Sequence, residues 1–315
     1  HMKKVELHLH LDGSIRPSTI SEILNINLEE AKKLSTIETK CASLKEYLTK
    51  FDIPLKIMQT KENLERVAFE LAQDLQKDDV IYAEIRFAPN KHLKSGLTLD
   101  EVVTAILKGL SQVPIKTNLI LCMMRGDSYE QNLKVIKLAK KYLNHGVVAI
   151  DLAGSEASYP VNLYQELFEI AQKENIPFTI HAGEADEPLS VINAINLGAK
   201  RIGHGVRAIE SEKALKLIKE KNITLEVCPK SNLDTNMYEK LSNHPIKKLY
   251  DMGLLVTINT DNRTVSNTNL TKSYQDLQEV FSFTKQDFLK MNENALQSAF
   301  LNQAEIEELL ALLHK

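Results

Sequence analysis

Short apolar, β-branched runs alternate along the chain with longer segments of helical periodicity. The clearest helical segment has apolar residues three and four positions apart, at Leu64, Val67, Ala68, Leu71, Ala72 and Leu75. A shorter helix is predicted around Ile192–Leu197, which Gly198 would end. The runs between helical segments predict eight strands, at Val5–His10, Val80–Ala88, Thr117–Met124, Val147–Leu152, Pro177–His181, Arg201–His204, Thr224–Cys228 and Leu255–Thr260.

Eight strands that alternate with helices predict an α/β fold with a parallel sheet, and eight is the number that closes a (β/α)₈ TIM-type barrel. A doubly wound open sheet is the alternative, but no G-x-G-x-x-G follows the first strand. No Gly/Ser/Pro-rich linker divides the sequence, so we expect residues 1–315 to form one domain. The segment Ser18–Glu62 is too long for a plain connection after the first strand, which predicts extra helices forming a lid.

Composition narrows the class of protein. The 315 residues are 43% hydrophobic and 26% charged, as in an ordinary globular protein. The net charge is −3 without a basic stripe, which argues against nucleic acid as a partner. Cys41, Cys122 and Cys228 form no C-x-x-C pair, and no run resembles a signal peptide or membrane span, so we expect a cytoplasmic protein. His1 looks like a cloning remnant before Met2 and is left out of the prediction.

The first strand carries the first candidate chemistry, in V-E-L-H-L-H-L-D-G. Alternation along a strand turns four apolar residues towards the helices, namely Val5, Leu7, Leu9 and Leu11. The same alternation turns four polar residues into the barrel, namely Glu6, His8, His10 and Asp12. Two histidines at i, i+2 can converge on one metal ion. The alternative is two separately hydrogen-bonded histidines, which is less favourable because neighbouring buried imidazoles need partners even when neutral.

Polar motifs also follow four later strands, at the end of a barrel where active sites lie. They are Asp151-Leu152-Ala153-Gly154, His181-Ala182-Gly183-Glu184, Gly203-His204-Gly205 and Asn259-Thr260-Asp261-Asn262. Zinc binds imidazole nitrogens and carboxylate oxygens, so the histidines of the first strand, His181 and Asp261 form a candidate ligand set. Glu184 can face the same pocket as a proton shuttle. His204 can orient or deprotonate a metal-bound water, or it can be a core histidine bonded to the backbone.

In this order, from Val5 to Asp261, the motifs resemble the adenosine deaminase family of metal-dependent amidohydrolases. H-x-H alone fits many amidohydrolases, whereas H-A-G-E together with G-H-G narrows the resemblance to the adenosine/AMP deaminase branch. The resemblance implies hydrolysis of adenosine and 2′-deoxyadenosine to inosine and ammonia, with Glu184 protonating purine N1 and His204 handling the attacking water. It also implies one Zn²⁺ per chain, held by His8, His10, His181 and Asp261.

The resemblance also assigns residues to the substrate. Asp12 is expected near the ribose 5′-hydroxyl, and the backbone N–H of Gly154 is expected to meet purine N3. Asn262 stands where many family members have a second aspartate, which is expected to contact N7. An amide donates to N7 without being protonated, so that contact should survive the replacement. Asn262 could alternatively cap a helix after the eighth strand.

A helical pattern in the extra segment has two interpretations. Four residues at i, i+3, i+4 and i+7 share one helix face, namely Leu44, Tyr47, Leu48 and Phe51. The pattern resembles the family's lid helix over the substrate, and it is equally typical of plain core packing. Glu84 and Arg86 in the second strand predict a buried ion pair. Four other histidines receive no function, namely His92, His145, His244 and His314.

The sequence motifs also bear on other enzyme classes, metal counts and substrates. The cytidine-type zinc deaminases use H-x-E and P-C-x-x-C, and neither is present. Binuclear amidohydrolases often use a lysine on the fourth strand, which V-V-A-I-D-L-A-G lacks, so one metal is expected. A 5′-phosphate would be repelled by Asp12 and would want clustered cations. Because Arg16 and Arg263 lie near the motifs, AMP remains an alternative substrate, as do adenine and modified adenosines. A catalytically silent purine-binding barrel would have lost Glu184 or a ligand.

Overall fold

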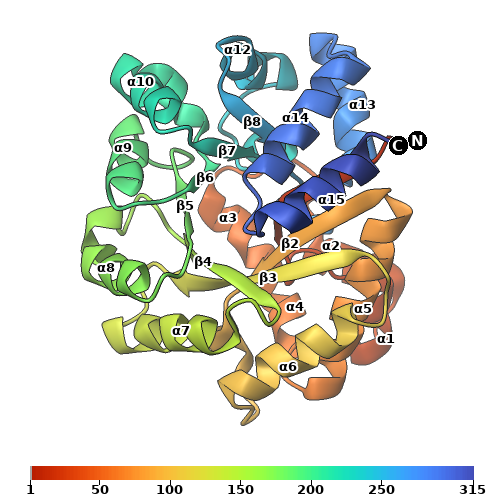
Figure 1. Ribbon diagram of the computed structural model, residues 1–315. Coiled ribbons are helices and arrows are strands. Elements are labelled where there is room, and N and C mark those ends of the chain that lie inside the picture. The colour runs from red at the N-terminus through yellow and green to blue at the C-terminus, as the bar shows by residue number, and fades with distance from the viewer. Residues whose placement is uncertain (1) are drawn as a thin grey trace.

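The computed structural model describes residues 2–315, and His1 lies outside the described residues. The fold is α/β, with all eight predicted strands present and parallel to their neighbours (Figure 1). Their bounds are β1 Lys4–His10, β2 Val80–Phe87, β3 Lys116–Met124, β4 Val147–Ala153, β5 Thr179–Ala182, β6 Arg201–His204, β7 Thr224–Val227 and β8 Leu255–Ile258. The predicted bounds differ from these by no more than about two residues, within the usual uncertainty of strand ends.

The strands form two four-stranded sheets, in the orders β1-β2-β3-β4 and β5-β6-β7-β8. At one seam the Ile150 amide donates to the Pro177 carbonyl at 3.1 Å. At the other seam the His10 amide donates to the Asp261 carbonyl at 2.8 Å, and the Asp261 amide donates to the His8 carbonyl at 3.0 Å. Bridges between the two sheets at both seams give the arrangement that a (β/α)₈ barrel requires.

Helices surround the strands on the outside (Figure 1). They are α5 Lys61–Lys77, α6 Leu99–Leu110, α7 Tyr129–Tyr142, α8 Gln165–Lys173, α9 Pro188–Asn196, α10 Glu212–Glu220, α12 Ile246–Asp251, α13 Leu270–Phe281, α14 Lys285–Gln297 and α15 Gln303–Leu313. The predicted apolar face of α5 is buried along its whole length. Helix α6 begins at a capping box, because the Thr98 and Glu101 side chains satisfy each other's backbone amides. The two helices that the sequence periodicity predicts are present as α5 and α9, so both predictions are confirmed.

The interior below the active end holds a charged network rather than the predicted Glu84–Arg86 pair. The Arg86 guanidinium contacts Asp151 at 3.1 Å and Glu226 at 3.0 Å, while Glu84 pairs with Arg201 at 2.7 Å. The predicted pairing is wrong because opposite charges on other strands lie within ion-pair distance of each residue and take its place as partner. Side chains from facing strands come closer across the barrel interior than these two do along β2.

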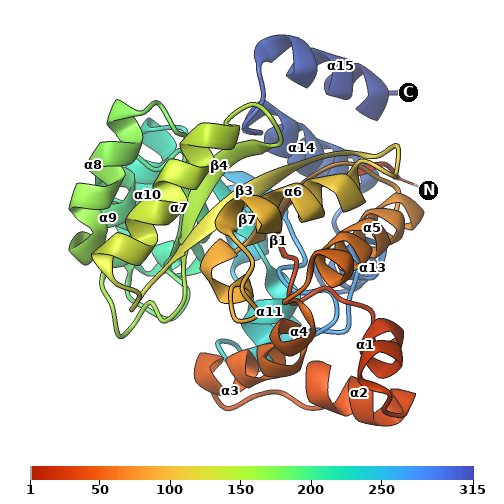
Figure 2. The same ribbon diagram turned by 90° about the horizontal axis from the view of Figure 1, so that it is seen from below.

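The long segment after β1 folds into extra helices, as predicted. They are α1 Pro17–Leu24, α2 Leu28–Ser35, α3 Leu44–Leu48, the 3₁₀ turn η1 Thr49–Phe51 and α4 Asp52–Ile57. Figure 2 shows them together at one end of the molecule, near the short helix α11 Pro229–Asp234. The three cysteines are buried and free. Among residues 2–315, no helix combines the length and apolar character needed to cross a membrane.

Candidate active site

Four predicted metal ligands meet at one end of the barrel. His8 and His10 lie on β1, His181 lies on β5, and Asp261 follows β8. The Oδ1 atom of Asp261 lies 3.1 Å from His8 Nε2 and 3.2 Å from His10 Nε2. One nitrogen or oxygen from each of the four residues lies within 4.8 Å of the others. Strands from both sheets thus bring three imidazoles and a carboxylate to a single point.

The outer nitrogens of two of these histidines already have acidic partners. His8 Nδ1 lies 2.9 Å from Glu226 Oε1, and His181 Nδ1 lies 2.9 Å from Asp151 Oδ2. Because an ionised carboxylate only accepts hydrogen bonds, each Nδ1 carries the proton and each Nε2 keeps a lone pair. This is the orientation that metal-ligating histidines adopt. Burial also lowers the pKa of His181, so its imidazole is neutral, as a ligand must be. The donor set therefore fits a divalent metal such as zinc.

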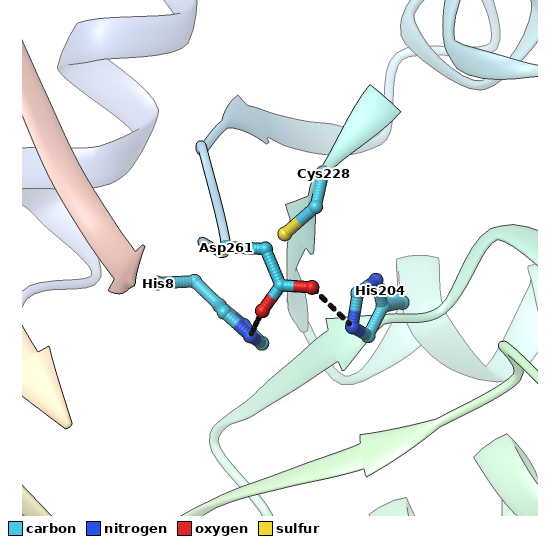
Figure 3. Close-up of side chains that lie close together, drawn as sticks. All are labelled: His8, His204, Cys228 and Asp261. Atoms are coloured by element: carbon cyan, nitrogen blue, oxygen red, sulfur yellow. Dashed lines mark hydrogen bonds and ion pairs between the residues drawn. The ribbon is translucent and has the colours of Figure 1, made fainter. Parts of the chain in front are cut away.

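A second group of possible ligands shares the Asp261 carboxylate. Figure 3 shows this carboxylate between His8 and His204, with the Cys228 thiol beside it. Burial, with the charge of Asp261, raises the pKa of Cys228 well above its ordinary value. A metal binds the thiolate rather than the thiol, so this group fits less well than the one with His10 and His181. Cys228 is fully buried.

Glu184 and His204 lie next to each other beside the ligand cluster. Their Oε2 and Nε2 atoms are 3.4 Å apart, and His204 Nε2 lies 3.8 Å from Asp261 Oδ2. Burial, reinforced by the charges of Asp261 and Glu156, raises the pKa of Glu184 well above its ordinary value. Burial lowers the pKa of His204 well below its ordinary value. Both shifts favour the uncharged forms, a protonated carboxylic acid at Glu184 and a neutral imidazole at His204.

The backbone is strained where two of these side chains leave their strands. His204 has φ 67° and Asp261 has φ 63°, in the left-handed region that L-residues rarely occupy. Such conformations cost on the order of 1–3 kcal/mol and concentrate at functional sites. His204 is also not the backbone-bonded core histidine of the alternative prediction, because its ring nitrogens face the side chains of Asn232, Glu184 and Asp261.

One cavity of about 840 Å³, open mouth included, lies over the cluster. It is lined by all seven predicted substrate-binding residues, namely Asp12, Gly154, Asn262, Leu44, Tyr47, Leu48 and Phe51. Leu44, Tyr47 and Phe51 also pack in an apolar cluster with Val265. The helix face after β1 therefore covers the cavity and also packs internally, so both interpretations of its pattern describe the structure. That these residues bind substrate stays a prediction.

Comparison with known proteins agrees with this site. Residues 3–315 match the family described as adenosine deaminase. Relatives named adenosine deaminase from Clostridium kluyveri and Enterococcus faecalis are 44% and 42% identical to this chain. The alignments cover 97% and 96% of this chain, and 92% and 94% of the relatives. This chain belongs to the adenosine deaminase family.

Solved structures share the fold at lower identity. Adenine deaminase from Arthrobacter aurescens superimposes with a TM-score of 0.91 at 23% identity, covering 100% of this chain and 98% of that one. The Arabidopsis N6-mAMP deaminase gives 0.89 at 24% identity, covering 99% and 98%. An amidohydrolase from Burkholderia ambifaria with bound Zn gives 0.90 at 21% identity, covering 99% and 90%. These likenesses support the barrel architecture of the adenosine deaminase fold.

Asn262 is held below the lid rather than at a helix start. Its Nδ2 donates to the Tyr47 hydroxyl at 3.1 Å, which lies 2.7 Å from Ser266 Oγ. The residue that caps α13 is Asn269, so the predicted helix-cap alternative for Asn262 is wrong. A Cβ on Gly13 would lie 1.9 Å from Asn262 Oδ1, which explains the glycine in L-D-G. Within residues 2–315, Asn262 Oδ1 has no hydrogen-bond partner.

The sequence prediction missed Glu156, which anchors the H-A-G-E turn. Its buried carboxylate accepts hydrogen bonds from the backbone amides of Gly183 at 2.7 Å, Glu184 at 3.1 Å and Ala185 at 3.0 Å. Ser190 Oγ donates to the same carboxylate at 2.6 Å. Glu156 follows D-L-A-G by two residues, so its position on the same rim as H-A-G-E was the available signal.

Asn232 and His244 were also missed, and His244 had been left without a function. Asn232, on α11, donates from Nδ2 to Glu184 Oε2 at 3.3 Å, and the same atom lies 3.2 Å from His204 Nδ1. His244 Nε2 lies 2.9 Å from Asn232 Oδ1. The available signal was the polar pair Ser231-Asn232 after the seventh strand, on the same rim as the other motifs. Ser231 Oγ donates to Asp261 Oδ2 at 2.7 Å.

Arg16 and Arg263, which had left AMP as an alternative substrate, pair with acidic residues outside the cavity. Arg16 Nη2 lies 2.9 Å from Asp74, and Arg263 Nη1 lies 3.0 Å from Asp78. Neither arginine lines the cavity, where Lys91 is the one Lys or Arg among the described residues. The structure therefore does not offer the clustered cations that a phosphate group favours.

Proposed function

We propose that this chain hydrolyses adenosine and 2′-deoxyadenosine to inosine or 2′-deoxyinosine and ammonia, using one Zn²⁺ held by His8, His10, His181 and Asp261. One observation carries the proposal: three residues of the ligand cluster, His10, His181 and Asp261, line the same cavity as the buried acid Glu184. The proposal treats the barrel and its lid as one catalytic domain. Family membership and the relatives named adenosine deaminase support the same activity.

The four ligands would hold a zinc ion, which would supply an activated water as the nucleophile, because zinc lowers the pKa of a bound water to about 7. The unprotonated Nε2 atoms, which Glu226 and Asp151 orient, support this assignment. A protein of the same fold, the Burkholderia amidohydrolase, was solved with bound Zn. We assign to His204, which lies next to the cluster, the role of holding the attacking water.

Glu184 supplies the acid that the reaction needs. Carbon C6 of adenine is a weak electrophile because the aromatic ring shares its electron density. A proton on N1 withdraws electron density from the N1–C6 bond and makes C6 open to attack. The raised pKa of Glu184 favours the protonated carboxyl group, which is the form that can donate to N1. After attack, the C6 hydroxyl proton passes to the amino group, the C6–N6 bond breaks to release ammonia, and C6 becomes the carbonyl carbon of the product.

The remaining cavity residues position the nucleoside. The Gly154 N–H is assigned to N3, the Asn262 amide to N7 and the Asp12 carboxylate to the 5′-hydroxyl. The apolar lid residues cover the base and exclude water from the site. None of these contacts uses the 2′-hydroxyl, so 2′-deoxyadenosine is included. Asp12 and the engaged arginines argue against a 5′-phosphate.

The test is ammonia release by zinc-assayed protein supplied in parallel with adenosine, 2′-deoxyadenosine, AMP, N6-methyl-AMP and adenine. We expect kcat/KM for the two nucleosides to exceed that for AMP at least about tenfold. Chelator-treated protein is the control for metal dependence. Preferred turnover of AMP, N6-methyl-AMP or adenine would keep the chemistry and overturn the substrate assignment. No turnover of any of them by zinc-loaded protein would overturn the function.

A further inference from the structure

The Asn232 side chain lies between the two proposed catalytic residues and a third, fully buried side chain. Its Nδ2 lies 3.3 Å from Glu184 Oε2 and 3.2 Å from His204 Nδ1. Its Oδ1 lies 2.9 Å from His244 Nε2. Asn232 is completely buried and His244 is 3% exposed, so water does not replace these partners. The orientation of this amide therefore decides whether Glu184 and His204 each face a hydrogen-bond donor or an acceptor.

A backbone amide fixes that direction. The Ile246 N–H donates to His244 Nδ1 at 3.0 Å. Because a backbone N–H can only donate, His244 Nδ1 is unprotonated, and the ring carries its proton on Nε2. His244 Nε2–H then donates to Asn232 Oδ1. The two Nδ2 protons of Asn232 therefore face Glu184 and His204. In a flipped amide, the NH2 group of Asn232 would face the Nε2–H of His244, which would set one donor against another.

Each proton of Asn232 then constrains one catalytic group. His204 Nδ1 accepts one of them, so the proton of the His204 ring lies on Nε2, the nitrogen that faces Glu184 and Asp261. Glu184 Oε2 accepts the other, and His204 Nε2 also approaches that oxygen, at 3.4 Å. When Glu184 is protonated, its proton therefore lies on Oε1, because Oε2 faces two donors.

We propose that Asn232 and His244 are positioning residues that fix the proton positions of His204 and Glu184. In this arrangement His204 orients the attacking water by donating a hydrogen bond from Nε2, and it does not start the reaction as the general base. Glu184 presents the proton on Oε1 to N1. The consequence for water and N1 rests on the proposed function, whereas the proton positions follow from the hydrogen bonds alone.

The direct test is ¹⁵N NMR of the imidazoles in metal-loaded protein labelled at histidine, with the His204 signals identified by their loss in His204→Gln. We expect a protonated Nε2 and an unprotonated Nδ1 for His204. A proton on His204 Nδ1 would overturn the proposal. The spectrum needs no turnover, so inactive protein with the expected spectrum would overturn the proposed function and leave the proton positions standing.

A matched pair at His244 tests the effect on catalysis. Gln keeps an N–H donor for Asn232 Oδ1, whereas Met has a similar length and no donor. We expect His244→Met to lower kcat about tenfold or more, with KM and zinc content within about twofold, and to change the His204 spectrum. His244→Gln should keep kcat at least about fivefold above the Met variant and retain the His204 tautomer. Equal kcat and an unchanged His204 spectrum in both variants would contradict the proposal. If the Met variant does not fold, the parent spectrum still decides.

Discussion

The ligand cluster and the lid above it are held in different ways. Two of the ligand histidines on strands have a buried acidic partner, Glu226 for His8 and Asp151 for His181. The lid face is apolar, and Leu48 is 39% exposed. Within this face, Tyr47 bonds to the barrel side, through Ser266 and Asn262. Directional bonds hold the ligand histidines, whereas this lid face rests mostly on non-directional apolar contacts.

The supporting network below the cluster is charged and closed to water. Although burial opposes ionisation, Arg86 and Arg201 hold the pKa of Glu226 well below its usual range. The ionised Glu226 can then accept from His8, Arg86 and Arg201 together. Removing one partner of such a network leaves a buried charge uncompensated, which costs about 3–5 kcal/mol. The comparison therefore predicts that changes below the cluster strongly lower zinc affinity or stability, and that changes in the lid have small effects on the kinetic constants.

The largest effect is expected at Glu184. Glu184→Gln removes the proposed acid for N1 and keeps nearly the same size, so kcat should fall about 10²–10⁴-fold. Zinc content should match that of the parent, because Glu184 is not a ligand in the proposed set. Steady-state kinetics with adenosine and metal analysis of the same sample measure both quantities. A kcat within about tenfold of the parent value would remove Glu184 from the role of acid.

A smaller loss is expected in the supporting network, at Glu226. Glu226→Gln removes the charge that orients His8, so zinc affinity should fall about 10–100-fold. Glu84→Gln is the matched control, because Glu84 is equally buried and pairs with the same Arg201 without contacting a ligand histidine. Both variants should unfold at lower denaturant concentration, and Glu226→Gln alone should lose zinc in competition with a chelator. Equal zinc affinity in the two variants would show that the network serves stability and not the ligands.

The contrast between the two regions also separates what the sequence predicted from what it could not. Alternation on β1 placed His8 and His10 together because the geometry of a strand is local and fixed. The roles of Glu156, Asn232 and His244 arise because segments that follow different strands meet at the rim. No local sequence pattern encodes that meeting. The wrong Glu84–Arg86 pairing has the same origin, since the partners of each residue come from across the barrel. The lid pattern could not be resolved because its residues both pack and cover the cavity.

The smallest effect is expected in the lid, at Tyr47. Tyr47→Phe removes the hydroxyl that joins the lid to Asn262 and Ser266 but keeps the ring in its apolar cluster. One neutral hydrogen bond contributes about 0.5–1.5 kcal/mol, so KM for adenosine should rise about 2- to 10-fold. Zinc content should be unchanged and kcat should change less than KM, because the ligands and Glu184 keep their partners. Leu48→Ala is the apolar control, since it trims the same helix without touching this bond. A loss of zinc, or a fall in kcat larger than the rise in KM, would show that the lid helps to hold the cluster and would end the distinction between the two regions.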